Sequence, residues 1–163
     1  MNLKKLVIIL LVLLAAVIFG LYVYGSKPYT VSEDEIALYI KMDVREDVGL
    51  IVLDYSFDEH EYSGGIANAD KSMIKKGEEI IYVWSREELQ AGGDVFGQRV
   101  KIGIRFRIIT EYVDPNYENN YPEELMVYLD PIEFETDFGK AFNVTFTGDK
   151  VNGYSVKVEP REQ

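Results

Sequence analysis

The sequence predicts an all-β domain, an antiparallel sandwich of two sheets with about seven or eight strands, preceded by a single N-terminal transmembrane helix. Apolar residues dominate the first 25 positions, and beyond them short runs alternate between apolar and polar residues, with turn residues in between. The sequence contains no long amphipathic helical pattern and no alternation of helices with strands. The strands must therefore cover one another's apolar faces, as the two sheets of a sandwich do.

An uncharged run from Leu6 to Tyr24 follows Lys4 and Lys5. As a helix, its 19 residues would extend about 28 Å, close to the roughly 30 Å hydrocarbon core of a bilayer. The positive-inside rule keeps the two lysines in the cytoplasm and places the rest of the chain outside it. The expected organisation is a transmembrane anchor at residues 1–25, a short linker at residues 26–34 and an extracytoplasmic domain at residues 35–163.

A cleaved signal peptide is the alternative for the first 25 residues. Its apolar region would be about 7–15 residues long and would end in a cleavage site of the small-x-small type. The apolar run here is longer, and Val23-Tyr24-Gly25 matches such a site poorly. In this alternative the domain would be secreted instead of anchored.

Three strands are expected in the first half of the domain. Apolar and polar residues alternate in residues 35–47, and a turn leads into the second run, residues 49–57. Residues 78–84 form the third run. Ser85 then begins a Ser-x-x-Glu capping box, which predicts a short helix that a pair of glycines ends.

The second half begins with the clearest strand, residues 98–113, in which apolar residues alternate with four cations. Four more runs follow, each bounded by turn residues: 124–129, 132–136, 141–146 and 153–159. This number and spacing of strands resembles the immunoglobulin-like architecture, although the Cys…Trp…Cys pattern of immunoglobulin domains is absent. A small barrel is the alternative.

The charge balance excludes nucleic acid as a partner. Lys4 and Lys5 are among the 17 Lys and Arg residues, whereas all 28 Asp and Glu residues follow residue 25, so residues 26–163 carry a net charge of −13. Such a domain has no basic face for a phosphate backbone. The chain also has no cysteine, hence no disulfide and no thiolate nucleophile, which favours a bacterial envelope protein among exported proteins.

Opposite charges are placed on the polar faces of two expected strands. Charge pairs across neighbouring strands contribute about 0.2–1 kcal/mol each and help to set the register, so we expect these two faces to neighbour each other. The alternative is a basic stripe that binds an anionic surface polymer or a partner protein. The cations are Arg99, Lys101, Arg105 and Arg107, and the anions are Glu133, Glu135 and Asp137.

The stretch FDEHEYSGGIANAD holds the only histidine of the chain, His60, between two glutamates. Asp58, His60 and Asp70 are candidate metal ligands if the loop folds back. Transition-metal sites commonly use two or three histidines on a rigid frame, and neighbouring side chains in an extended segment point apart. We therefore interpret the stretch as a polar turn or a strand end, with the metal site as the alternative.

A second polar stretch, DPNYENNYPEE, holds a candidate calcium site. Asp114, Asn116 and Glu118 have the alternate-residue spacing that begins an EF-hand loop. The glycine and the glutamate that such a loop requires later are missing, so an ordinary connection between strands is the preferred interpretation. Tyr117 and Tyr121 in the same stretch are candidates for contact with a ligand or partner.

These observations predict a binding or interaction module at the cell surface, without catalytic activity and without a cofactor other than the candidate calcium ion. Residues 6–24 would hold it in the membrane, and its partner would be an envelope protein or a surface polymer. The alternative is a metal-dependent or carbohydrate-active surface enzyme that uses clustered carboxylates. An enzyme of the second kind would need a cleft with two carboxylates about 5–10 Å apart.

Overall fold

The computed structural model describes residues 12–15, 17, 29–111 and 122–162. The chain divides into two compact units, Met1–Thr30 and Val31–Gln163. In the first unit, residues 12–15 and 17 are helical and expose apolar side chains. The described part of the chain holds no helix long and apolar enough to cross a bilayer. Most of the predicted span, residues 6–24, lies outside the described residues.

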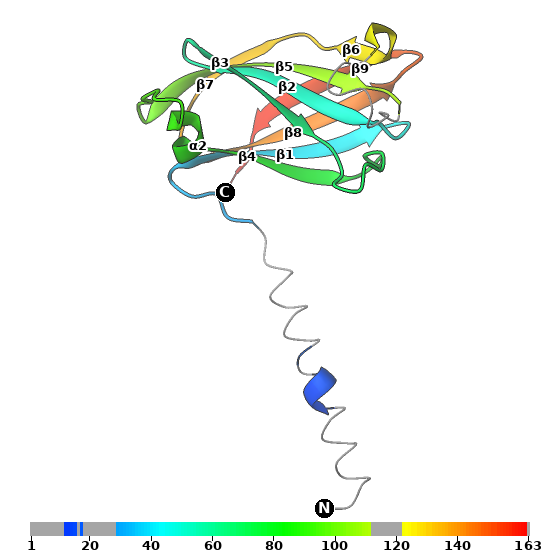
Figure 1. The fold of residues 1–163 in the computed structure, drawn as a ribbon, viewed down its shortest axis with the longest axis horizontal. Helices are drawn as coiled ribbons and strands as arrows, with labels where there is room; N and C mark the ends of the chain where they lie inside the picture. Colours follow the sequence, from blue (N-terminus) through cyan, green and yellow to red (C-terminus); the bar gives the residue numbers. More distant parts are fainter. Residues whose placement is uncertain (1–11, 16, 18–28, 112–121, 163) are drawn as a thin grey trace, which may run out of the picture. The chain divides into compact units, whose positions relative to one another are not determined.

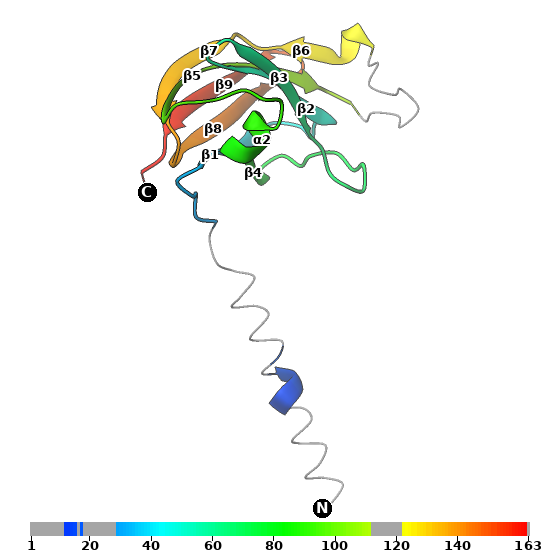
Figure 2. The same cartoon turned by 60° about the vertical axis from the view of Figure 1, so that its left-hand side comes forward.

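The second unit is a two-layered β-sandwich, as the alternation predicted (Figures 1 and 2). One sheet has the strand order β4-β1-β8-β9, and the other has the order β3-β2-β5-β6, with β7 also paired to β5. The strands within the described residues are β1 (Glu35–Val44), β2 (Leu50–Phe57), β3 (His60–Ile66), β4 (Glu79–Ser85), β5 (Arg99–Ile109), β6 (Met126–Tyr128), β7 (Ile132–Asp137), β8 (Lys140–Asp149) and β9 (Gly153–Pro160).

Within the described residues, two short helices join the strands. The α2 helix (Arg86–Gln90) follows β4, and Ser85 caps it by accepting a hydrogen bond from the Glu88 backbone amide at 3.1 Å. This confirms the helix that the capping box predicted. A 3-10 helix, η2 (Glu123–Leu125), precedes β6.

The expectation of a purely antiparallel sandwich is wrong for one pair of strands. β1 runs parallel to β8, with Ile36 opposite Lys140 and Val44 opposite Gly148. A parallel pair needs a long connection, and most of the domain lies between these two strands. β1 and β2 also lie in different sheets, whereas the first two strands of an immunoglobulin domain are neighbours in one sheet. The likeness to immunoglobulin domains is therefore confined to the two-layered architecture.

One strand, β3, was not among the predicted strands, because its residues belong to the stretch that we interpret as a polar turn or a strand end. β3 pairs antiparallel with β2, and only Asp58 and Glu59 connect the two strands. Asp58 adopts a positive φ of 53°, which aspartate tolerates in tight hairpin turns. β3 lies at the edge of its sheet and contains two glycines, so it lacks the apolar alternation that identifies a half-buried strand.

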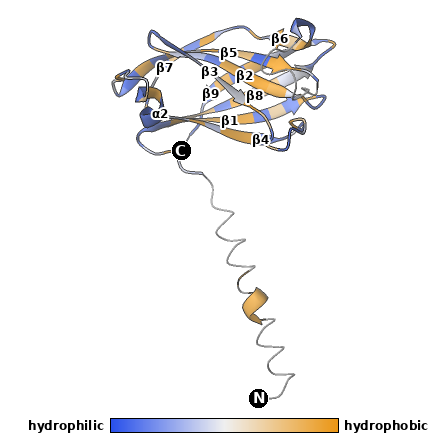
Figure 3. Cartoon of the chain, in the orientation of Figure 1, coloured by the Kyte–Doolittle hydropathy of each residue, from blue (hydrophilic) through white to orange (hydrophobic). Residues whose placement is uncertain are grey.

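Aromatic side chains join the two sheets through the core. Phe106 on β5 meets Phe146 on β8 edge to face, with ring centroids 5.1 Å apart, and Phe57 on β2 meets Trp84 on β4 at the same distance. All four side chains are buried. Hydrophobic and hydrophilic residues alternate along most of the strands, so that most strands give one face to this core and the other to solvent (Figure 3).

Replacing Phe146 by alanine should lower the free energy of unfolding by about 3–5 kcal/mol, because the neighbouring sheet cannot close over the cavity. Denaturant unfolding followed by the fluorescence of Trp84, the only tryptophan, measures this. The Val151→Ala control removes a side chain that is 84% exposed and should change stability by less than about 0.5 kcal/mol. Equal effects of the two substitutions would contradict the assignment of Phe146 to the core.

Candidate functional site

A groove of about 720 Å³ crosses the outer face of the five-stranded sheet. Residues of β2, β3, β5 and β7 line it, together with Pro131 at the start of β7. The groove is open to solvent, and its volume lies within the range of about 300–1,000 Å³ that is usual for ligand sites. A sheet packed on a filled core is a rigid support for such a site.

Small residues at neighbouring outward positions create the groove. Ser56 on β2 lies directly opposite Gly103 on β5, and Ser63 on β3 lies opposite Asp54 on β2. A Cβ atom added to Gly103 would lie 2.8 Å from the Ser56 hydroxyl, so a larger residue there would fill the floor of the groove. The sequence contained this signal, because Gly103 interrupts the regular cations of the 99–107 segment.

Ion pairs between β5 and β7 confirm that the predicted basic and acidic faces neighbour each other. The Arg99 guanidinium lies 2.9 Å from the Glu135 carboxylate, and the Lys101 ammonium lies 2.7 Å from the Glu133 carboxylate. The hydrogen bond that Lys101 donates to Glu133 raises the pKa of the lysine. Two of the four predicted contact cations are therefore engaged with β7.

Arg105 and Arg107 compete for a single carboxylate, that of Asp54 on β2. The register places Asp54 opposite Arg105, yet the carboxylate turns to Arg107, whose Nε lies at 2.7 Å and whose terminal nitrogen donates at 2.8 Å. The Ser63 hydroxyl donates to the same carboxylate at 3.0 Å. Among the described residues, Arg105 therefore has no ion-pair partner, and it lines the groove with its side chain exposed.

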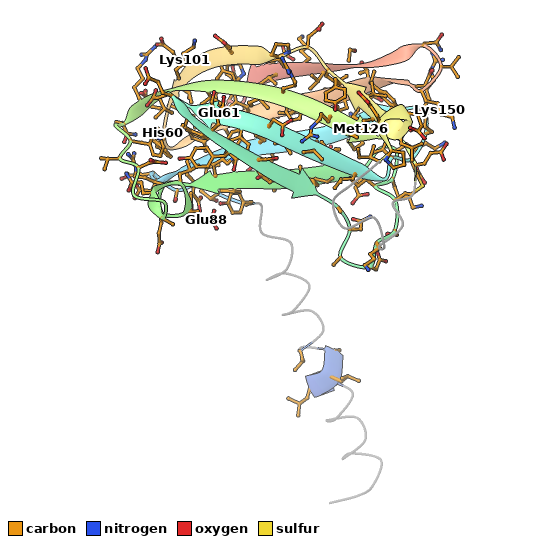
Figure 4. The ribbon with its side chains drawn as sticks, turned by 45° about the horizontal axis from the view of Figure 1, so that its top comes forward. His60, Glu61, Glu88, Lys101, Met126 and Lys150 are labelled. Carbon is orange, nitrogen blue, oxygen red and sulfur yellow. The ribbon has the colours of Figure 1, made fainter. Side chains whose placement is uncertain are left out.

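His60 is part of a second polar cluster, at one end of the sandwich (Figure 4). Its Nδ1 lies 2.9 Å from the carboxylate of Asp94, which belongs to the loop after α2. The Tyr62 hydroxyl donates to the other oxygen of Asp94 at 2.7 Å. The edge of the His60 ring meets the Phe96 ring, with centroids 5.5 Å apart. Asp94 thus ties the loop to β3, a contact that no local sequence pattern indicated.

Asp58 and Asp70, two of the predicted metal ligands, accept hydrogen bonds from separate backbone amides. Asp58 accepts a hydrogen bond from the Lys101 amide at 2.9 Å, and Asp70 accepts one from the Ser72 amide within its own turn. Within the residues that the structure describes, no three His, Cys, Asp or Glu side chains form a group that could hold a metal ion. The other predicted positions lie outside the described residues: Asp114, Asn116, Tyr117, Glu118 and Tyr121.

Comparisons with known proteins give no family for this chain. No family model matches the sequence, and no curated protein matches it significantly. The assignment of function therefore depends on the geometry of the groove and on the sequence before the sandwich.

Replacing Asp94 by asparagine should lower the pKa of Tyr62, which burial and the Asp94 carboxylate raise to about 12. The raised pKa means that the folded state holds the phenol proton more tightly than the unfolded state does, so this contribution to stability is complete below pH 10 and disappears between about pH 10 and 12. In the Asp94→Asn variant this loss should end at a lower pH within the window and be smaller in total, because the folded-state pKa of Tyr62 then lies closer to its unfolded value. NMR titration of ring-labelled tyrosine measures the pKa.

The control for this titration is Glu61→Gln, which removes an exposed carboxylate from the same strand without touching the Tyr62 hydroxyl. It should leave the pKa of Tyr62 unchanged. A Tyr62 pKa that is the same in the Asp94→Asn variant and in the wild type would show that the hydrogen bond to Asp94 is absent in solution.

Proposed function

We propose that this protein is a membrane-anchored binding module of the cell envelope, with its sandwich outside the cytoplasm and its contact surface on the outer face of the five-stranded sheet. The observation that carries the proposal is the groove, in which Arg105 has no described partner while its neighbours on β5 are neutralised. Isolated ion pairs on a sheet face are common and structural. An unpaired guanidinium over a hollow is the arrangement that a ligand can use.

The anchor in this proposal rests on the sequence. The run from Leu6 to Tyr24 has no charge and is long enough to cross a bilayer, and Lys4 and Lys5 precede it. The described helical residues within the run, 12–15 and 17, expose the side chains of valine, leucine and alanine, which favour an apolar environment. A sandwich of immunoglobulin-like architecture would then follow a short linker.

A glycan-cleaving enzyme would need two carboxylates free to act in this groove. Asp54 and Glu61 lie on neighbouring strands two residues out of register, which places them within reach of one substrate. The Asp54 carboxylate already accepts hydrogen bonds from Arg107 and Ser63 at one oxygen, and its other oxygen lies 2.7 Å from Arg107 Nε in the ion pair. This favours recognition over acid–base chemistry at the groove.

The full chain should remain in the membrane fraction of cells after an alkaline carbonate wash and should be released by detergent. Deletion of residues 1–25 should release the protein, because it removes the apolar run and leaves an acidic domain that anionic headgroups repel. Protease added outside the cytoplasmic membrane should digest the sandwich. Extraction of the full chain by carbonate alone would contradict the anchor.

A photo-reactive amino acid at position 61, beside the groove, should form cross-links to an envelope component in intact cells. The matched control is position 157 on β9, which is also exposed and charged but lies on the outer face of the other sheet. Gel shifts after illumination measure the cross-links. Equal adducts from both positions, or adducts from position 157 alone, would contradict this assignment of the contact surface.

A further inference from the structure

Building on the proposed function, we propose that the groove binds a glycan that carries carboxylate groups, and that Arg105 binds one of these carboxylates. The ligand class follows from four features of the outer face: the free guanidinium, the hydroxyl groups on the floor, an exposed aromatic ring beside the groove, and the local charge. Each feature excludes other kinds of ligand.

The guanidinium of Arg105 favours an anion with two oxygens side by side, as in a carboxylate or a phosphate. Arginine presents parallel N–H donors that match the two oxygens of a carboxylate. The carboxylates of the sheet do not meet this need, because Asp54 turns to Arg107 and Glu133 turns to Lys101. The anion that completes the arrangement must therefore come from the ligand.

The floor of the groove offers hydroxyl groups instead of backbone groups. The Ser56 hydroxyl has no hydrogen-bond partner among the described residues. The Ser63 hydroxyl donates one hydrogen bond to Asp54 and can still accept another. The backbone amides and carbonyls of β2 and β5 are used within the sheet. A peptide strand laid on this face would find no backbone partners, whereas the hydroxyl groups of a sugar can bond to Ser56, Ser63 and the exposed carboxylate of Glu61.

An exposed aromatic ring lies beside the groove on the same face. Tyr128 on β6 is directly opposite Arg107 on β5, one outward position along the strand from Arg105. Tyr128 is thus the diagonal cross-strand neighbour of Arg105, at a separation of about 7–8 Å, which a ligand of more than one sugar residue can span. Tyr128 is 52% exposed, so its ring can stack on the apolar face of a sugar next to the one whose carboxylate meets Arg105.

The local charge permits an acidic ligand despite the net charge of −13 in residues 26–163. Each carboxylate that lines the groove is paired with a cation except Glu61. Charges farther away than about 8 Å are screened at physiological ionic strength. The charges of Arg105 and Glu61 cancel, so the net charge of the groove lining is close to zero. An acidic ligand is therefore not repelled by the groove itself.

Titration of the full-length protein in detergent micelles with a uronic-acid oligosaccharide of four to six residues tests this proposal. The matched ligand is the methyl ester of the same oligosaccharide, which keeps the hydroxyl groups and loses the charge. We expect the acid to bind and the ester to bind about tenfold or more weakly. Arg105→Gln should weaken binding of the acid by a similar factor and leave binding of the ester unchanged.

Two further variants distinguish binding in the groove from nonspecific attraction to the cations of β5. Arg99→Gln removes an equal charge from the same face of β5 but outside the groove, and it should leave binding within about twofold. Gly103→Val fills the floor and should abolish binding of both ligands. Thermal unfolding of this variant checks that it folds, and the Arg105→Gln result does not depend on it.

Three results would overturn the proposal. The first is no binding of the acid at millimolar concentration, and the second is an equal loss of affinity in Arg99→Gln and Arg105→Gln. The third is equal, Arg105-dependent binding of a glutamate hexapeptide, which would indicate an acidic protein segment as the ligand. None of these three results contradicts the proposal of an anchored binding module, because the membrane wash and the cross-links at position 61 test that proposal separately.

Discussion

The architecture depends on the placement of β1 in the middle of its sheet. Among the described strands, β4 pairs only with β1, and β8 and β9 reach β4 only through it, so the four-stranded sheet does not exist without this strand. β1 is correspondingly buried on both faces near its start, where Ile36, Ala37 and Leu38 are all fully buried. The parallel partner β8 is made late in the chain, so the sheet can close only when most of the domain has been synthesised. The first strand after the linker thus gains its second neighbour only when most of the domain has been made.

The closed core determines what the outer face of the second sheet can offer. Alternation sends the large side chains of β2 and β5 inward, among them Phe57 and Phe106, and leaves small or charged residues outward. The register then decides which charges meet, and it brings Asp54 within reach of two guanidinium groups. One carboxylate cannot serve both fully, and the ion pair with Arg107 leaves Arg105 available. The candidate site is therefore a consequence of register and of a charge excess on one strand, more than of any local motif.

Much of the fold was predictable because burial imposes a period of two on any strand with one face in the core. This signal identified every strand except β3, and the charges of β5 and β7 predicted their pairing. The alternation is lost in an edge strand that contains glycines, as β3 does. The alternation also contains no information about strand order, so it did not predict the parallel pairing of β1 with β8. The contact of His60 with Asp94 joins residues from separate elements and depends on how the loop after α2 lies, which local spacing cannot show.

The two polar clusters are coupled through β3. Glu61, the exposed acid beside the groove, stands between His60 and Tyr62, and both of these neighbours bind Asp94. An edge strand with two glycines has few packing contacts of its own, so its position depends on such ties and on the hairpin with β2. The Tyr82 hydroxyl also lies against Gly64, so a larger residue there would have to displace it. The histidine that first suggested a metal site therefore has a structural explanation: it helps to hold in place the strand that forms one wall of the groove.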